Sequence, residues 1–136
     1  MAWLSKQAEV ALAGVDLTLA QYRVLGLLAE GSAMSSAISD RLAVRPPSVT
    51  ALVDGLVARG LVDRRADAGD RRRVAVTVTA AGLELLAAAD AAVDARLVEI
   101  ASWLGDDDGG NEALGGLGRW SAALRARHLA RPGSTR

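Results

Sequence analysis

Arginine residues gather near the middle of this chain, where their type and spacing suit phosphate binding. Arg71, Arg72 and Arg73 follow Asp70 directly, after a stretch of small and polar residues. A guanidinium group is permanently charged and donates hydrogen bonds in a planar fork that matches phosphate oxygens. The run therefore indicates contact with a phosphate-bearing partner, with a solvated turn as the alternative.

Residues 46–58 are predicted to form a helix that presents a second set of contact residues. Pro46 suits the first helical position, where its missing N–H has no partner within the helix. Apolar residues then recur at spacings of three and four, which predicts one buried face, and Gly60 follows as a C-cap. The buried face holds Val49, Leu52, Val53 and Leu56, and the small or polar opposite face holds Ser48, Ala51, Asp54 and Gly55.

After Gly60 the hydrophobic period changes from helical to alternating. Residues 61–65 and 73–78 are predicted as two strands, joined by a polar link with the glycine and aspartate typical of turns. Ala33 and Met34 can add a short third strand. A hairpin with arginines at its tip, directly after an exposed helix, is the layout of a winged helix-turn-helix. The predicted fold class is therefore mainly α with a small β-hairpin wing.

The same stretch carries the residues through which this chain resembles the MarR family of transcriptional regulators, over residues 17–86. The shared features are a glutamine early in the first domain helix, Gly-Leu-Val after the recognition helix, Asp-x-Arg in the wing, and Leu-Thr-x-x-Gly after the wing. Val78 replaces the leucine of the last motif, which is a conservative change. In this chain the features are Gln21, Gly60-Leu61-Val62, Asp70-Arg71-Arg72 and Val78-Thr79-Ala80-Ala81-Gly82.

The resemblance implies that the helix from Pro46 enters the major groove of DNA while the wing lies over the adjacent minor groove. Arg72 is then the minor-groove arginine and Asp70 the carboxylate that orients it, since a narrow A·T-rich groove attracts a guanidinium. Arg45 and the N-terminus of the helix can contact phosphate. The predicted DNA-binding residues are Ser36, Arg45, Pro46, Pro47, Ser48, Thr50, Ala51, Arg64, Asp70, Arg71, Arg72 and Arg73.

Some of these positions have a second interpretation. The hydroxyl of Thr50 can contact DNA or bond the backbone of its own helix. Arg64 can contact the DNA backbone or, like Arg73, pair with an aspartate of the hairpin. Ala51 offers only an apolar contact, such as to a thymine methyl, and Gly55 offers no side chain. Direct base readout should therefore be sparse, and sequence preference should depend on DNA shape.

Charged residues divide the chain into a basic and an acidic part, although sixteen basic residues balance sixteen acidic ones overall. Residues 41–73 hold eight arginines and four aspartates, a net charge of plus four. Residues 74–112 hold one arginine and eight acidic residues, a net charge of minus seven. This asymmetry suits a protein that presents one end to nucleic-acid phosphates.

The composition argues against several other classes of protein. The chain has no cysteine and a single histidine, His128, so disulfides, thiol redox switches and metal sites are not expected. It carries no nucleophile–histidine–carboxylate set and no phosphate-binding loop, so we predict neither an enzyme nor a cofactor. Without a signal peptide or a membrane-spanning stretch, a cytoplasmic protein with no membrane contact is expected.

Helices are predicted on both sides of the winged segment. A capping box of Thr18 and Gln21 opens a helix that extends to about Glu30, which gives Gln21 a local explanation beside the family one. Ser35 or Ser36 can cap the short helix that follows. Further helices are predicted over residues 2–13, 80–104 and 111–129.

We predict one domain over residues 1–136, with two lobes. Residues 17–79 form the winged DNA-binding lobe, and residues 131–136 form a disordered tail. The flanking segments 1–16 and 80–130 form a helical lobe whose apolar stripes favour a two-fold homodimer, with packing inside one chain as the alternative. The predicted dimer contacts are Leu4, Leu97, Ile100, Leu104, Leu117, Trp120 and Leu124.

Together these features predict a sequence-specific regulator that binds a pseudo-palindromic double-stranded operator, and the resemblance implies a ligand-responsive repressor. Family members often bind a small aromatic or anionic effector in a crevice beside the dimer helices. Candidate effector contacts are Trp3, Tyr22 and Trp103, with Trp120 a further one, although each is favoured instead as a core or interface residue. The alternative function is a winged-helix interaction module without specific DNA binding, which the arginine cluster disfavours.

Overall fold

The computed structural model describes residues 2–66, 69–70, 72–105 and 108–130 of the chain. Arg71 of the predicted wing tip and the predicted disordered tail, residues 131–136, lie outside the described residues. The chain divides into two compact units, residues 1–93 and 94–136.

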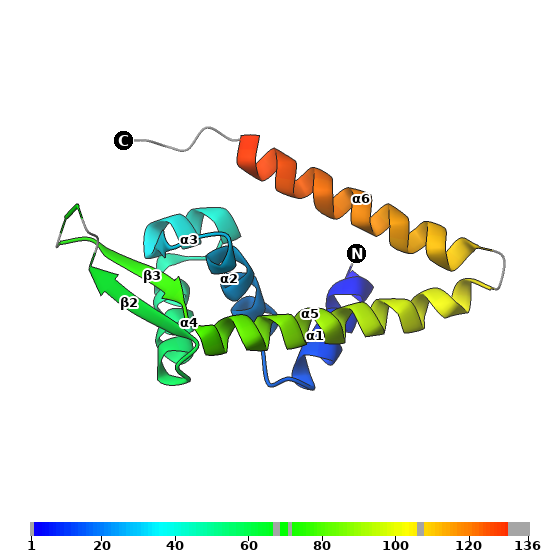
Figure 1. Cartoon of the computed structure of the whole chain (residues 1–136), viewed down its shortest axis with the longest axis horizontal. Coiled ribbons are helices and arrows are strands. Elements are labelled where there is room, and N and C mark those ends of the chain that lie inside the picture. Colours follow the sequence, from blue (N-terminus) through cyan, green and yellow to red (C-terminus); the bar gives the residue numbers. More distant parts are fainter. Residues whose placement is uncertain (1, 67–68, 71, 106–107, 131–136) are drawn as a thin grey trace. The chain divides into compact units, whose positions relative to one another are not determined.

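The structure is mostly helical with a small antiparallel sheet, which confirms the predicted fold class (Figure 1). No helix among the described residues is long and apolar enough to span a membrane. In chain order the elements are α1 (Ala2–Ala13), α2 (Leu19–Ala29), β1 (Ala33–Met34), α3 (Ser35–Leu42), α4 (Pro46–Ala58), β2 (Val62–Ala66), β3 (Val74–Val78), α5 (Ala80–Ala101), a 3₁₀ turn (Ser102–Leu104) and α6 (Gly109–Ala130).

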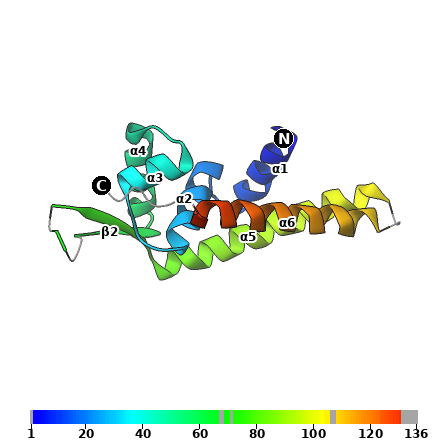
Figure 2. The same ribbon diagram turned by 90° about the horizontal axis from the view of Figure 1, so that it is seen from above.

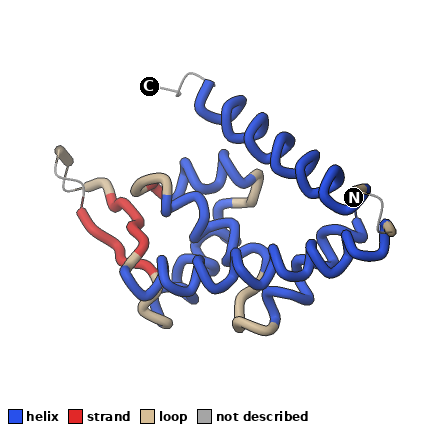
Figure 3. The backbone as a smooth tube through the Cα atoms, turned by 45° about the vertical axis from the view of Figure 1, so that its right-hand side comes forward, coloured by secondary structure: helices blue, strands red, loops and turns tan. Residues whose placement is uncertain are grey.

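The sheet has the strand order β1-β3-β2, with both pairs antiparallel (strands red in Figure 3). The predicted short strand β1 is confirmed, because Ala33 lies opposite Val76 in its register. Strand β2 begins one residue later than predicted. The N–H of Leu61 donates to the carbonyl of Leu56 at 3.0 Å and so completes the last turn of α4, which leaves Val62 as the first strand residue.

The two predicted N-terminal caps have different outcomes. The capping box of α2 is confirmed, since Thr18 and Gln21 each accept a hydrogen bond from the other's backbone N–H at 3.1 Å. The predicted serine cap of α3 is wrong. Met34 pairs with β3 in extended conformation directly before the helix, so Met34 occupies the N-cap position without a side-chain hydrogen bond and Ser35 is already helical.

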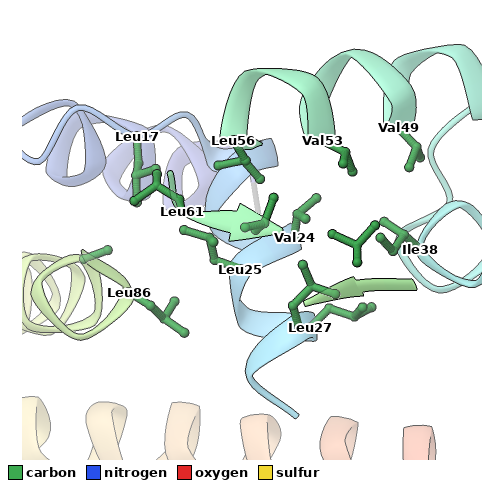
Figure 4. Packing of buried hydrophobic residues seen from close by; sticks show 14 of the residues in the cluster. Leu17, Val24, Leu25, Leu27, Ile38, Val49, Val53, Leu56, Leu61 and Leu86 are labelled. Carbon is green, nitrogen blue, oxygen red and sulfur yellow. The ribbon is translucent and has the colours of Figure 1, made fainter. Parts of the chain in front are cut away.

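One hydrophobic core holds the first unit together. Leucine, valine and isoleucine side chains from the helices and strands of residues 1–93 meet between α2, α4 and the sheet (Figure 4). Leu25, Ile38 and Leu56 are completely buried, and Leu12 of α1 and Leu86 of α5 belong to the same cluster. The core therefore fixes α4, the predicted recognition helix, in place.

The second unit contains the end of α5, the 3₁₀ turn and α6. Helices α5 and α6 have nearly the predicted bounds, although α5 ends at Ala101 rather than extending to Leu104. A Cβ at Gly110 would lie 2.9 Å from the carbonyl oxygen of Ala101, so this glycine lets the start of α6 approach the end of α5. Ala101 is the buried hydrophobic residue of this unit among the side chains described.

Candidate nucleic-acid interface

Helix α4 is held on one face and open on the other. Val49, Val53 and Leu56 are completely buried, and Figure 4 shows them pointing from α4 into the core; Leu52 is half-buried. The buried face is therefore the one predicted. The predicted DNA-binding residues at the start of α4 are all exposed: Arg45, Pro46, Pro47, Ser48, Thr50 and Ala51.

The N-terminus of α4 offers few free backbone donors. Pro46 and Pro47 occupy its first two positions and have no N–H, and the N–H of Ser48 donates to the carbonyl of Arg45 at 2.9 Å. The predicted phosphate contact at this helix end would therefore depend on the Arg45 side chain and the helix dipole more than on backbone N–H groups.

The turn between α3 and α4, which lie side by side in Figures 1 and 2, is supported by hydrogen bonds from two elements. Ala43 adopts a left-handed conformation with φ of 53°, where glycine would be less strained. The hydroxyl of Ser39 donates to the carbonyl of Val44 at 2.6 Å. From α2, the guanidinium of Arg23 donates to the carbonyl of Leu42 at 3.0 Å. Sequence reasoning missed Arg23, because its partner lies far away in the chain and no local pattern marks it.

Thr50 and Gly55 test the predicted exposed face. The hydroxyl of Thr50 donates to the carbonyl of Pro46 at 3.2 Å, which is the backbone alternative considered for this residue. Gly55 is half-buried, and a Cβ there would lie 3.9 Å from Nε2 of Gln21. Gly55 therefore does not lie on the open face as predicted, because this position of α4 faces Gln21 of α2. Gln21 thus both caps α2 and faces α4.

The wing turn is shaped by Asp70. Its carboxylate accepts a hydrogen bond from the backbone N–H of Arg72 at 2.9 Å, and its carbonyl accepts one from the N–H of Arg73 at 2.9 Å. Asp70 thus orders the backbone that carries Arg72. Both arginines are exposed, and within the part of the chain that the structure describes neither forms an ion pair.

An ion pair connects the wing to the predicted recognition helix. The guanidinium of Arg64 on β2 donates to the carboxylate of Asp54 on α4. The sequence left open a partner within the hairpin, and the structure places that partner on α4 instead. Arg65 does lie near a hairpin carboxylate, 3.9 Å from that of Asp63. Asp54 was missed as a partner because a helix–strand contact of this kind has no sequence signature.

The predicted effector residues are placed on different surfaces. Trp3 is 83% exposed and Trp103 is 86% exposed, so the core interpretation of both residues is wrong. Tyr22 is half-buried, and its hydroxyl donates to the carboxylate of Asp90 at 2.6 Å. A groove of about 560 Å³ near α1 and α2 is lined by none of these three; its lining is Glu9, Ala13, Leu17, Thr18, Leu19, Ala20 and Arg23.

The predicted dimer contacts are mostly exposed. Trp120 of α6 is 70% exposed, and Leu4, Leu104, Leu117 and Leu124 are exposed as well. Leu97 and Ile100 of α5 are half-buried. Apolar side chains of this size on the surface mark a face that another surface can cover.

Comparison with known protein sequences gives helix-turn-helix transcriptional regulators as relatives. The model of the MarR family matches residues 15–73. The uncharacterized HTH-type transcriptional regulator ML2140 of Mycobacterium leprae is 39% identical over 92 residues, or 67% of this chain, and the match spans 64% of the length of that protein. The uncharacterized HTH-type transcriptional regulator Mb0904 of Mycobacterium bovis is 37% identical over 97 residues, or 71% of this chain and 68% of that protein.

Solved structures have the same fold. A mutant MarR from E. coli superposes with a TM-score of 0.76 at 23% identity and covers 89% of both chains. A MepR mutant from S. aureus, bound to an oligodeoxyribonucleotide, gives a TM-score of 0.67 at 24% identity over 90% of this chain and 91% of that chain. CouR from Rhodococcus jostii RHA1, bound to p-coumaroyl-CoA, gives 0.70 at 26% identity over 99% of this chain and 89% of that chain.

Proposed function

The chain belongs to the MarR family of DNA-binding transcriptional regulators with a winged-helix fold, and from this we propose that it binds a specific, pseudo-palindromic operator as a homodimer. The observation that carries the proposal is the open face of α4 followed by a wing whose Arg72 and Arg73 make no ion pair among the described residues. Unpaired guanidinium groups beside an exposed helix suit a phosphate-rich groove.

In the proposed complex, α4 lies in the major groove and Arg72 enters the adjacent minor groove. The exposed side chains of α4 are short, so base contacts from the helix are few: a hydroxyl from Ser48 and an apolar contact from Ala51. The bond of Thr50 to its own helix leaves its hydroxyl oxygen as an acceptor only. Sequence preference then depends strongly on minor-groove shape at the wing. The oligodeoxyribonucleotide bound to MepR supports DNA as the partner.

Fluorescence anisotropy tests this proposal with the duplex upstream of the chain's own gene and a scrambled duplex. We expect the dimer to prefer the upstream duplex. Its affinity should fall steeply with salt, by about 10³–10⁵-fold between 50 mM and 200 mM if about 6–10 phosphates are contacted. Equal and weak binding to both duplexes would count against an operator at that position.

Two arginine variants separate groove reading from charge. Arg72→Ala should cost about 1–3 kcal/mol of binding and should reduce the preference for A·T pairs under the wing. Arg65→Ala is the matched control, since it removes the same charge from the same hairpin at an exposed position on β2. We expect Arg65→Ala to weaken both duplexes alike. If both variants lose affinity equally for every DNA sequence, the proposal that Arg72 binds in the minor groove is wrong.

A confirmed dimer that binds neither duplex at low salt would instead support the winged-helix interaction module. The exposed Trp120, Leu117 and Leu124 on α6 support the homodimer, because a lone chain leaves this apolar surface in water. A two-fold dimer would present two recognition helices to the two halves of a palindrome.

We further propose that a small aromatic or anionic effector releases the protein from DNA and so relieves repression. The p-coumaroyl-CoA bound to CouR, an aromatic acyl group on a phosphate-bearing carrier, supports this class of ligand. Titration of the DNA complex with p-coumaroyl-CoA and with p-coumarate should raise the apparent Kd for DNA. Replacement of Tyr22, Trp3 or Trp103 by phenylalanine identifies the effector-binding residues, because the effector should then raise the apparent Kd for DNA less.

A reporter under the upstream promoter tests whether the protein is a repressor. Its activity should rise when the gene of the protein is deleted.

A further inference from the structure

The end of α4 and the beginning of α5 are joined through one side chain. The hydroxyl of Thr79 donates to the carbonyl of Gly60 at 2.7 Å and accepts a hydrogen bond from the N–H of Gly82 at 3.1 Å. The backbone N–H of Thr79 donates to the carbonyl of Leu61 at 3.0 Å. Thr79 therefore caps the first turn of α5 and binds two carbonyl groups that directly follow α4.

The two segments also approach too closely for any side chain at position 82. A Cβ on Gly82 would lie 2.1 Å from the carbonyl oxygen of Leu61 and 2.7 Å from Cγ2 of Val78. Real Cβ atoms do not approach other atoms this closely, so only glycine fits without displacing α5. The contact is thus a backbone-to-backbone one between α5 and the segment that ends α4.

This segment is part of the C-terminal turn of α4. The N–H of Gly60 donates to the carbonyl of Val57 at 2.9 Å, and the N–H of Leu61 donates to that of Leu56 at 3.0 Å. Leu56 is completely buried in the core. A change in the direction of α5 at Thr79 would therefore act on the last turn of α4 through short, direct hydrogen bonds.

A second contact fixes the direction of α5 within the same unit. The hydroxyl of Tyr22 on α2 donates to the carboxylate of Asp90 at 2.6 Å. Asp90 lies eleven residues after Thr79, about 16 Å along the helix axis at 1.5 Å per residue. Asp90 is also the polar interruption in an otherwise apolar stripe of α5. Two separated contacts define the orientation of α5 relative to both α4 and α2.

We propose that Thr79 and Gly82 are positioning residues that set the half-site spacing this regulator accepts. The inference rests on the proposed function, in which α5 and α6 form the dimer and each α4 reads one half-site. In such a dimer, the α4–α5 junction fixes how far apart and at what angle the two recognition helices lie. Half-site spacing on DNA follows from that geometry.

The test uses duplexes that differ only in the separation of two half-sites. An operator is first selected from random duplexes by the wild-type dimer. Four duplexes are then compared, in which the separation of the half-sites is one base pair shorter than selected, as selected, and one or two base pairs longer. A duplex with a single half-site serves as the reference. Thr79→Val removes the hydroxyl at constant shape. We expect Thr79→Val to bind the single half-site with wild-type affinity. The ratio of its affinities for the best and the next-best spacing should fall roughly three- to tenfold, which corresponds to the free energy of one hydrogen bond.

A matched control and a second variant complete the design. Thr77→Val removes a threonine hydroxyl that donates to the carbonyl of Asp63 at 3.4 Å, a bond between the paired strands β2 and β3. It should keep the wild-type spacing profile. Thr79→Asp can still accept from the N–H of Gly82 and cap α5, but it has no proton to donate to Gly60. It should flatten the spacing profile even if Thr79→Val folds poorly, and Thr79→Ser should restore the wild-type profile.

The outcomes are distinct from those of the proposed function. If wild-type protein selects no duplex at all, the proposed operator reading is wrong and the spacing role is wrong with it. If wild-type protein shows a spacing optimum and Thr79→Asp retains the same ratios, the positioning role is overturned while operator reading stands. An equal loss of affinity on every duplex, including the single half-site, would also overturn it, because that is the result of a weaker fold.

Discussion

The two units of this chain place their apolar side chains in opposite ways. In residues 1–93, fifteen hydrophobic residues form a buried cluster, and helices and strands share it. In the described residues of 94–136, Ala101 is buried while Trp103, Leu104 and Trp120 are exposed. The first unit thus completes its core with one chain. The second leaves Trp103, Leu104 and Trp120 for another surface to cover, which is why we propose that it makes dimer contacts, together with the exposed Leu4 of α1.

Replacement of a core leucine should have the largest effect on folding. Leu25→Ala removes a completely buried side chain from α2 and should lower the free energy of unfolding by about 2–5 kcal/mol. Urea denaturation followed by circular dichroism measures this loss. A loss below about 1 kcal/mol, the usual effect of a point mutation, would show that the first unit has no tight core.

Replacement of Trp120 should act on association instead. Trp120→Ala removes a large exposed aromatic side chain from α6 and should weaken the dimer by about 2 kcal/mol, roughly thirtyfold in Kd. Analytical ultracentrifugation over a dilution series gives the constant. Val74→Ala, which truncates an exposed apolar residue of the wing strand β3, is the control and should leave the dimer unchanged. A wild-type chain that stays monomeric at high concentration would contradict the proposal that the second unit covers its apolar surface in a dimer.

Glycine replacements should have opposite signs in the two units. Gly82→Ala introduces a methyl group against the carbonyl of Leu61 and should destabilise the protein by about 1–3 kcal/mol. Gly115→Ala lies within α6 with no atom near the added methyl, so it should stabilise that helix by about 0.5–1 kcal/mol. Thermal unfolding of both variants decides the signs. A Gly82→Ala variant as stable as the wild type would contradict the close approach at Gly82, whatever the sign at Gly115.

The ion pair between Arg64 and Asp54 should have the smallest effect. Both side chains are partly exposed, so a double-mutant cycle with Arg64→Gln and Asp54→Asn should give a coupling of about 0.2–1 kcal/mol. The coupling should decrease in 1 M NaCl, where the Debye length is about 3 Å. Chemical denaturation of the four proteins provides the data. A coupling that does not depend on salt would show that a contact other than charge attraction joins β2 to α4.

Local patterns were sufficient for most of the secondary structure. The capping box at Thr18, the proline start of α4 at Pro46 and the alternation in β3 each depend on neighbours within a few residues. Where a local signal competed with a distant partner, the prediction was wrong. A serine is a good cap by propensity, but Met34 pairs with β3 and the helix already begins at Ser35, so neither Ser35 nor Ser36 is the cap.

The candidate site likewise has features that local patterns predict and features that depend on distant residues. The exposed start of α4 could be predicted, because helical periodicity determines which face is buried once the core side is known. The inward position of Gly55 could not, since it depends on where Gln21 of α2 lies. The pairing of Arg64 with Asp54 and the three-way contact of Thr79 likewise join residues from different elements. Thr79 stands directly before a long apolar helix, which signals an N-cap, but nothing in the sequence names Gly60 as its second partner.

The sequence by itself determined the order of helices and strands, the arginine-bearing wing and the basic segment beside α4. These depend on side-chain type and on spacing along the chain, which are written in the sequence directly. Only the tertiary structure decided which apolar stripes are buried within one chain, which charges are already paired, and how α4 is joined to α5. Those outcomes depend on distances between residues far apart in sequence, and the balance of packing across the whole core sets them.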